Sequence, residues 1–202
     1  MQPDEPQLVD RSRDGDLSAF NAIVERYQSQ VYNVSARILG DRHLAEDVAQ
    51  ETFIKAHRSI DGFRGGSLRA WLLRIASNLS LDATRSRKRR PTESLEAASE
   101  RPGFSVPSGA PGPEQEALQG ELREKIQDCI TSLPDDQRAV VVLVDVQGLS
   151  YDEAAEAIGS AVGTVKSRLA RGRRRLRDAL MDHRELLPAQ FRQIDRGRAS
   201  DG

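Results

Sequence analysis

Residues 165–180 of this sequence, "VKSRLARGRRRLRDAL", form a dense basic run. From Lys166 to Arg177 seven residues are basic and none is acidic. Clustered arginines and lysines can neutralise phosphates and form hydrogen bonds with base edges. The whole chain is close to neutral, with 30 Lys and Arg against 31 Asp and Glu. The run is therefore either a solvated helix face or a segment that binds a nucleic acid.

The order of residues within the run favours nucleic-acid binding. At 100° per residue of an α-helix, an apolar seam forms from Val162, Val165, Leu169, Gly172 and Leu176. The opposite face combines small residues with arginines: Gly163, Ser167, Ala170, Arg171 and Arg174, flanked by Thr164 and Arg175. Small residues let a helix lie close in the major groove, where arginines reach bases or phosphates. A solvated face would usually interleave glutamates, but no acid appears before Asp178.

The residues before this helix predict that it is the second helix of a helix-turn-helix. "SYDE", residues 150–153, is a capping box with Ser150 as the cap and Glu153 at the third helical position. The short helix it starts extends to Ile158, and Gly159–Ser160 form a tight turn before the basic helix. Two helices joined by such a turn are typical of a DNA-binding helix-turn-helix.

Two further helices are predicted upstream of this motif. Apolar residues at helical spacing run from Leu118 to Leu133, and "PDD" at 134–136 begins the next helix. The run "AVVVLV" at 139–144 is β-branched and could form a strand by propensity. We predict a helix there, because helices flank the run and Gly148 ends it after about four turns.

The N-terminal half also reads as helices. Asp16 caps a first helix that Gly40 ends, and Asp41 caps a second. After a turn-rich loop at 61–67, Ser67 caps a third helix that continues into a basic end at 85–90. On the second helix, one polar face is formed by Asp47, Gln50 and Glu51.

A second candidate surface lies around this loop and the outer side of the third helix. Its residues are Phe63, Arg64, Trp71, Arg74, Asn78, Arg85, Arg87 and Lys88. Aromatic, amide and guanidinium groups offer what unstacked bases need, namely a stacking surface, edge hydrogen bonds and phosphate contacts. For Trp71, packing in the core is an equally good interpretation.

Composition predicts two small all-α domains joined by a flexible linker at 91–116, which contains five prolines and three glycines. The single cysteine, Cys129, excludes an internal disulfide and fits a reducing cytoplasm. The acidic N-terminus is not a signal peptide, and no apolar run reaches the roughly 20 residues that span a membrane.

No catalytic or cofactor chemistry is indicated. His43 and Glu46 have an i, i+3 spacing but lack a second such pair, so neither a metal site nor another cofactor is expected. The stretch "GFRGGS" lacks the spacing of a phosphate-binding loop, and Cys129 lies on an apolar helical face. We therefore expect a protein that is not an enzyme.

Two stretches together resemble the extracytoplasmic-function (ECF, or group IV) sigma factors of bacterial RNA polymerase. The first is "AEDVAQETFIKAHRSIDGFRGGSLRAWLLRIASNLSLDATRSRKRR" and the second is "LPDDQRAVVVLVDVQGLSYDEAAEAIGSAVGTVKSRLARGRRRL". The likeness covers about 14–90 and 118–180.

The resemblance implies a role for each part of the chain. Residues 7–90 resemble the sigma-2 domain, in which Asp47, Gln50 and Glu51 would dock on the β′ clamp helices of core polymerase. The second candidate surface, around the loop at 61–67 and the outer side of the third helix, would capture a base flipped from the single-stranded −10 element. Residues 117–182 resemble sigma-4, which contacts the β flap and reads the duplex −35 element; the corresponding residues are Thr164, Lys166, Ser167, Arg168, Ala170, Arg171 and Arg174.

The resemblance also implies a linker at 91–116 that threads toward the polymerase active centre, and control by an anti-sigma factor. No role is assigned to the tail at 183–202. Two other functions fit part of the sequence. A conventional helix-turn-helix regulator would not need the Phe63 and Asn78 loop surface. A nucleic-acid enzyme such as a recombinase would need a nucleophile with an arginine cluster or a carboxylate metal site, and the sequence shows neither.

Overall fold

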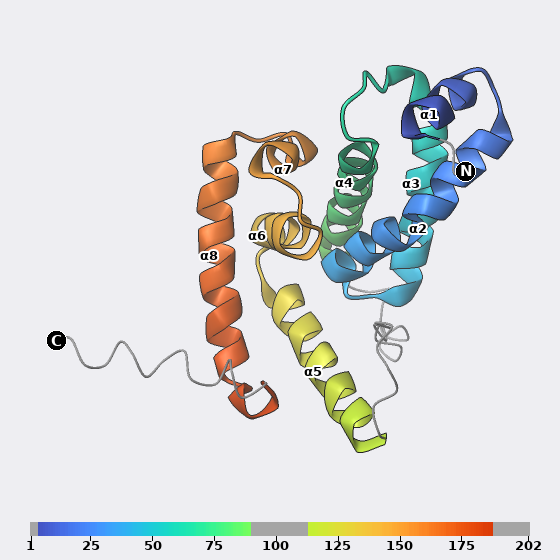
Figure 1. Ribbon diagram of the computed structural model, residues 1–202. Coiled ribbons are helices and arrows are strands. Elements are labelled where there is room, and N and C mark those ends of the chain that lie inside the picture. The colour runs from blue at the N-terminus through green and yellow to red at the C-terminus, as the bar shows by residue number, and fades with distance from the viewer. Residues whose placement is uncertain (1–3, 90–112, 188–202) are drawn as a thin grey trace.

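The computed structural model describes residues 4–89 and 113–187, and the regular elements in these ranges are all helical (Figure 1). The all-α fold predicted from the sequence is confirmed. Most of the predicted linker and the tail beyond residue 187 lie outside the described residues. None of the described helices is long and apolar enough to cross a membrane.

The first half consists of four α-helices and a short 3₁₀ turn: α1 (Glu5–Arg13), α2 (Leu17–Leu39), α3 (Arg42–Arg58), η1 (Ile60–Gly62) and α4 (Leu68–Arg89). The predicted caps are confirmed. Asp16 accepts hydrogen bonds from the first backbone amides of α2, and Asp41 accepts one from Leu44 N at 3.1 Å. Hydrogen bonds from Ser18 and then Arg11 hold the pKa of Asp16 well below its usual range. Gly40 ends α2 with a φ of 67°, a left-handed conformation that glycine adopts freely.

The second half comprises α5 (Pro113–Ser132), α6 (Asp135–Val141), η3 (Val142–Val146), α7 (Tyr151–Ile158), α8 (Val162–Met181) and η4 (Arg184–Leu186). The β-branched run is helical as predicted, with η3 continuing α6 as a π-helical segment. Residues 139–143 are at most 1% exposed, so burial on all sides outweighs their strand propensity. The predicted capping box is present, since Ser150 and Glu153 exchange both hydrogen bonds.

The helices α6 and α8 approach each other most closely at Gly172. A Cβ atom there would lie 2.8 Å from Val141 Cγ2, closer than packed carbon atoms allow. We expect Gly172→Ala to lower the free energy of unfolding by about 1–3 kcal/mol through overpacking. Gly163→Ala on the same helix is the control, because no atom lies within 4 Å of its added Cβ. Chemical denaturation of both variants checks this, and equal stabilities would contradict it.

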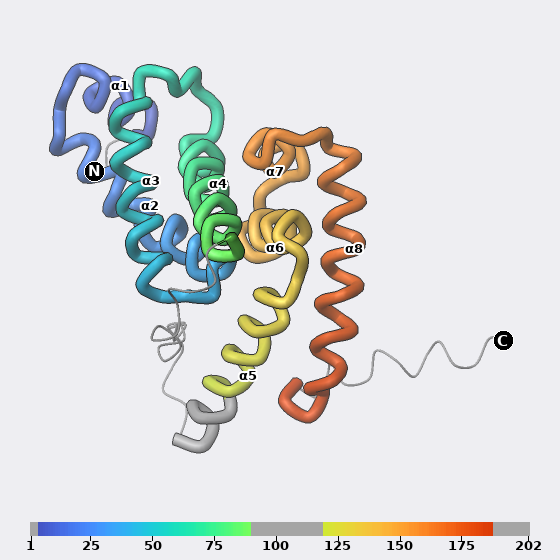
Figure 2. The backbone as a smooth tube through the Cα atoms, turned by 180° about the vertical axis from the view of Figure 1, so that it is seen from behind, coloured from blue at the N-terminus to red at the C-terminus, as the bar shows by residue number. Residues whose placement is uncertain are grey.

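The two halves pack against each other, which the sequence did not predict. Helix α4 packs against α7, and the C-terminal end of α2 lies against α5 and α6 (Figures 1 and 2). Arg138, only 5% exposed, donates from Nη1 to Ile38 O at 2.7 Å and from Nη2 to Leu133 O at 2.8 Å. The last carbonyls of a helix lack intrahelical partners and attract positive charge. Arg138 therefore supplies a partner for α2 from the other half of the chain.

Candidate nucleic-acid interface

Helix α8 presents the predicted mixed face to solvent. Val165 and Leu169 are buried at 0% and 2% exposure, which fixes the rotation of the helix. As a result, an exposed surface forms along its outer side from Gly163, Lys166, Ser167, Ala170, Arg171 and Arg174. Arg171 Nε donates to Ser167 O at 3.2 Å, within the helix itself. We call these six residues the α8 face.

Other basic residues of the run pair with acids of the same domain. Arg168 Nε lies 3.1 Å from Asp136 Oδ2, and Arg173 forms a two-pronged ion pair with Asp145. The hydrogen bond to Asp145 raises the pKa of Arg173. Thr164 and Arg168 are half-buried rather than exposed, and the DNA contacts of every residue predicted on α8 stay predictions. The basic run thus divides into an exposed face and residues that bind its own domain.

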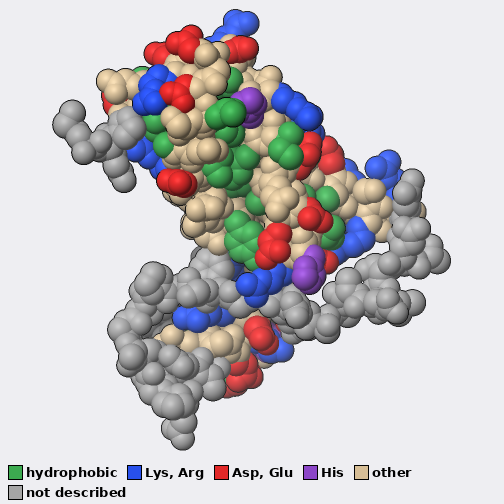
Figure 3. Space-filling model, turned by 90° about the vertical axis from the view of Figure 1, so that its right-hand side faces the viewer, with side chains coloured by type: hydrophobic (Ala, Val, Ile, Leu, Met, Phe, Trp, Pro, Cys, Tyr) green, Lys and Arg blue, Asp and Glu red, His purple; other side chains and the backbone are tan. Residues whose placement is uncertain are grey.

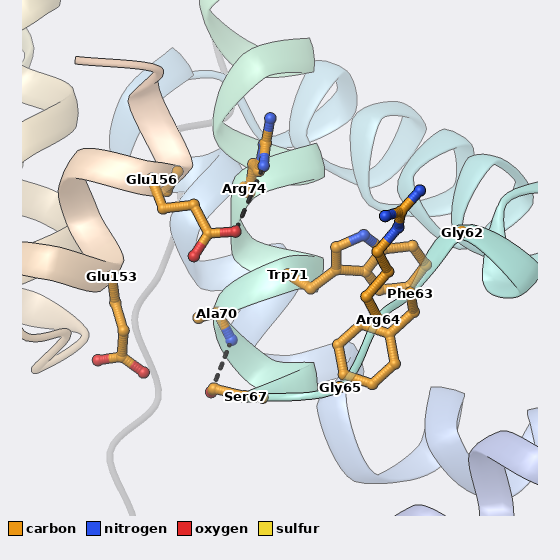
Figure 4. Close-up of a pocket in the computed structure, with 12 residues that line it drawn as sticks. Gly62, Phe63, Arg64, Gly65, Ser67, Ala70, Trp71, Arg74, Glu153 and Glu156 are labelled. Carbon is orange, nitrogen blue, oxygen red and sulfur yellow. Dashed lines mark hydrogen bonds and ion pairs between the residues drawn. The ribbon is translucent and has the colours of Figure 1, made fainter.

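A cavity of about 320 Å³ lies beside the loop between η1 and α4, and we call it the loop cavity (Figure 4). The loop comes from the first half of the chain, and α7 closes the opposite side. Phe63 is buried, and its ring centroid lies 5.4 Å from that of half-buried Trp71. Ser67 Oγ accepts a hydrogen bond from Ala70 N at 3.1 Å and so begins α4 beside the cavity. The structure therefore brings together Phe63, Arg64, Trp71 and Arg74, as the sequence analysis expected.

Two glutamates of α7 complete this cavity. Arg74 Nη1 lies 3.6 Å from Glu156 Oε1, and Glu153 lines the same wall (Figure 4). No local sequence signal indicates a role for Glu156, because its position depends on how the two halves pack. Both partners are more than a third exposed, so solvent screens this ion pair and its contribution to stability is small.

The remaining predicted −10 residues lie farther along α4. Asn78 is exposed one helical turn beyond Arg74 and does not line the loop cavity. Arg85 pairs with Asp82 at 3.2 Å, Arg87 with Asp41 at 3.6 Å, and Lys88 with Asp135 at 2.8 Å. These three basic residues therefore have acidic partners within the chain, while Asn78 extends the exposed side of α4.

The polar face of α3 borders a groove between α2 and α3. Asp47 and Gln50 are exposed, and Glu51 is half-buried. The groove has a volume of about 390 Å³ and combines polar with apolar side chains, among them Tyr32, Gln50 and Phe53. Figure 3 looks onto the first half of the chain, where apolar side chains are exposed between acidic and basic ones. Such a surface suits a protein partner, because apolar contact can be combined with charge pairing there.

The described residues offer little for catalysis. They contain no group of three His, Cys, Asp or Glu side chains able to hold a metal. Cys129 is buried, and burial raises the pKa of its thiol, which keeps it protonated and unreactive. The exposed guanidinium, amide and aromatic groups of these surfaces are able to bind bases, phosphates and protein side chains.

The family model described as Sigma-70 region 2 matches residues 23–90, and Sigma-70, region 4 matches residues 123–176. The ECF RNA polymerase sigma factor SigE of Mycolicibacterium smegmatis is 40% identical over 83% of this chain, which spans 63% of that relative. SigW of Bacillus subtilis, also an ECF RNA polymerase sigma factor, is 41% identical over 86% of this chain and 95% of its own length. The structure of RpoE from Bartonella quintana, solved with the anti-sigma factor NepR, has a TM-score of 0.62 and 27% identity, covering 80% of this chain and 96% of that one.

Proposed function

Because this chain belongs to the ECF sigma factors of bacterial RNA polymerase, we propose that its two domains, residues 7–90 and 117–182, divide promoter recognition between them. The protein is an alternative sigma factor, an initiation factor rather than an enzyme, and it directs transcription from particular promoters. The second domain reads the duplex −35 element with the α8 face. The observation that supports this most strongly is the buried Val165 and Leu169 seam, which turns small residues and arginines outward together.

The first domain captures an unpaired base of the −10 element. Phe63 and Trp71 offer aromatic surface beside the loop cavity, and a flipped base gains about 1–3 kcal/mol from such stacking. Asn78 supplies amide groups for the base edges, and Arg74 supplies charge for the phosphates. In the described structure Arg74 faces Glu156, so DNA and α7 compete for the same guanidinium. Binding of a −10 phosphate to Arg74 therefore breaks the ion pair with Glu156.

The polar face of α3, formed by Asp47, Gln50 and Glu51 and called the α3 face below, docks on core polymerase in the bacterial cytoplasm. We expect a triple substitution of Asp47, Gln50 and Glu51 by alanine to weaken core binding by about tenfold or more, because three contacts of one docking face are lost. Fluorescence anisotropy of labelled chain titrated with core polymerase measures this. The control replaces Glu25 and Asp61, acids outside this face, by alanine. Equal affinity of the triple variant and the wild type would contradict the assignment.

Regulation by an anti-sigma factor follows from the same surfaces. The Bartonella RpoE structure was solved with such a factor, NepR. In this chain a partner of that kind would act by covering the α3 face or by holding the two domains together.

A further inference from the structure

Helix α1 is anchored firmly beside the loop between η1 and α4. Leu8 and Val9 are 1% and 4% exposed, and they pack in the core shared with α2. Buried Ser12 donates from Oγ to Leu8 O at 2.6 Å and ties the last turn to the helix. The backbone that carries Arg13, in this last turn, is therefore held in place.

Arg13 extends from that turn to the loop. Its Nε donates to Ile60 O at 3.4 Å, and its Nη2 donates to Phe63 O. Nη1 donates to Asp10 Oδ1 at 3.1 Å, which orients the guanidinium. A planar guanidinium can hold two acceptors at a fixed spacing, so one side chain secures both ends of the η1 turn.

The loop is held by the buried side chains of Ile60, Phe63 and Leu68 and by few backbone hydrogen bonds of its own. Its local backbone hydrogen bonds run from Gly62 N to Ser59 O and from Phe63 N to Ile60 O. Gly65 and Gly66 follow with φ values of 89° and 87°, and an added Cβ at either would meet open space. Glycines in open space do not hold a loop in one conformation. The Phe63 ring is buried in the core, and the Arg13 contact fixes the backbone from which this ring projects.

We propose that Arg13 is a positioning residue for capture of the −10 base. By holding the Ile60 and Phe63 carbonyls it keeps the Phe63 ring against Trp71 before DNA arrives. Binding of the −10 base then requires less additional ordering of the loop, which lowers the entropic cost of binding. Unlike Glu156, Arg13 belongs to the first domain, so this support does not depend on how the two halves pack. The inference rests on the proposed function, because it assumes that this loop receives the base.

The test uses holoenzyme and a promoter fork with 2-aminopurine in place of each −10 base in turn. Fluorescence rises when the analogue leaves the base stack. We expect Arg13→Gln to slow this rise about tenfold at the captured position while core binding and −35 affinity stay unchanged. Arg13→Lys keeps the charge but cannot span both carbonyls, so its rate should fall in between. Arg11→Gln, which removes an equal charge from the same helix, should behave as the wild type.

The outcomes separate this inference from the proposed function. If no position gives a fluorescence rise with wild-type holoenzyme, capture itself is wrong. If the wild type captures a base and Arg13→Gln captures it equally fast, only the role of Arg13 is wrong. Should Arg13→Gln lower the melting temperature, Arg13→Lys decides the matter, because wild-type stability together with a wild-type capture rate would overturn the proposal.

Discussion

Replacing Arg171 and Arg174 together by alanine is expected to weaken holoenzyme binding to duplex −35 DNA by about a hundredfold. Both residues lie on the α8 face. A good arginine contact with a base edge is worth about 1–3 kcal/mol, so two such losses total about 2–6 kcal/mol, a range that includes the roughly 2.7 kcal/mol of a hundredfold change. Electrophoretic mobility shift at several salt concentrations measures the affinity. The dependence on salt should become less steep because fewer counterions are released.

The matched control removes the same charge from another side of the helix. Arg173 is paired with Asp145, and Arg177 lies 3.7 Å from Asp178. We expect Arg173→Ala with Arg177→Ala to weaken binding by less than about tenfold, because the acidic partners already compensate these charges. Equal losses from both double variants would mean that α8 contributes only diffuse charge and does not read a sequence.

Asn78→Ala is expected to slow open-complex formation by roughly tenfold to a hundredfold at promoters that carry the preferred −10 base. A base held out of the stack without a partner for its polar edge leaves hydrogen-bonding groups unsatisfied, which costs about 1–3 kcal/mol. Permanganate reactivity of unpaired thymines follows the opening in time. At promoters with a different base at that position, the variant and the wild type should open at similar rates.

The control for this substitution is Asp82→Ala. Asp82 is exposed one turn beyond Asn78 on the same helix and pairs with Arg85. We expect it to leave the opening rate unchanged within about twofold, since loss of one exposed ion pair has little energetic effect. A uniform loss for Asn78→Ala at every promoter sequence would argue that Asn78 supports the helix or contacts the backbone, and does not select a base.

Most of the helices and their caps could be predicted from sequence because the signals are local, but α1, which precedes Asp16, was not predicted. Asp16, Asp41 and Ser150 act on amides two or three residues away, and the Val165 and Leu169 seam follows from helical periodicity alone. The same periodicity predicted that the α8 face is exposed to solvent. It could not show that Arg168 pairs with Asp136, because that acid comes from α6 and its position depends on tertiary packing.

What the sequence could not predict is the packing of one half on the other. Arg138 looks like an ordinary polar residue of α6, but it is buried against the carbonyl of Ile38, 100 residues earlier. Glu156 and Arg13 likewise lie beside the loop only because distant helices lie next to it. No local sequence pattern indicates these contacts, because each joins residues far apart in the chain. The match of residues 23–90 to Sigma-70 region 2 also separates this chain from a conventional helix-turn-helix regulator, which sequence reasoning had kept as an alternative.

Transcription of the source genome's DNA by core polymerase, with and without the chain, followed by sequencing of the RNA 5′ ends, tests promoter-specific initiation directly. We expect a limited set of start sites that appear only with the chain and share one −35 and one −10 sequence. The Asn78→Ala and the Arg171 and Arg174 variants should lose these starts. If the chain binds duplex DNA but yields no promoter-specific transcript, its assignment as a working sigma factor is contradicted.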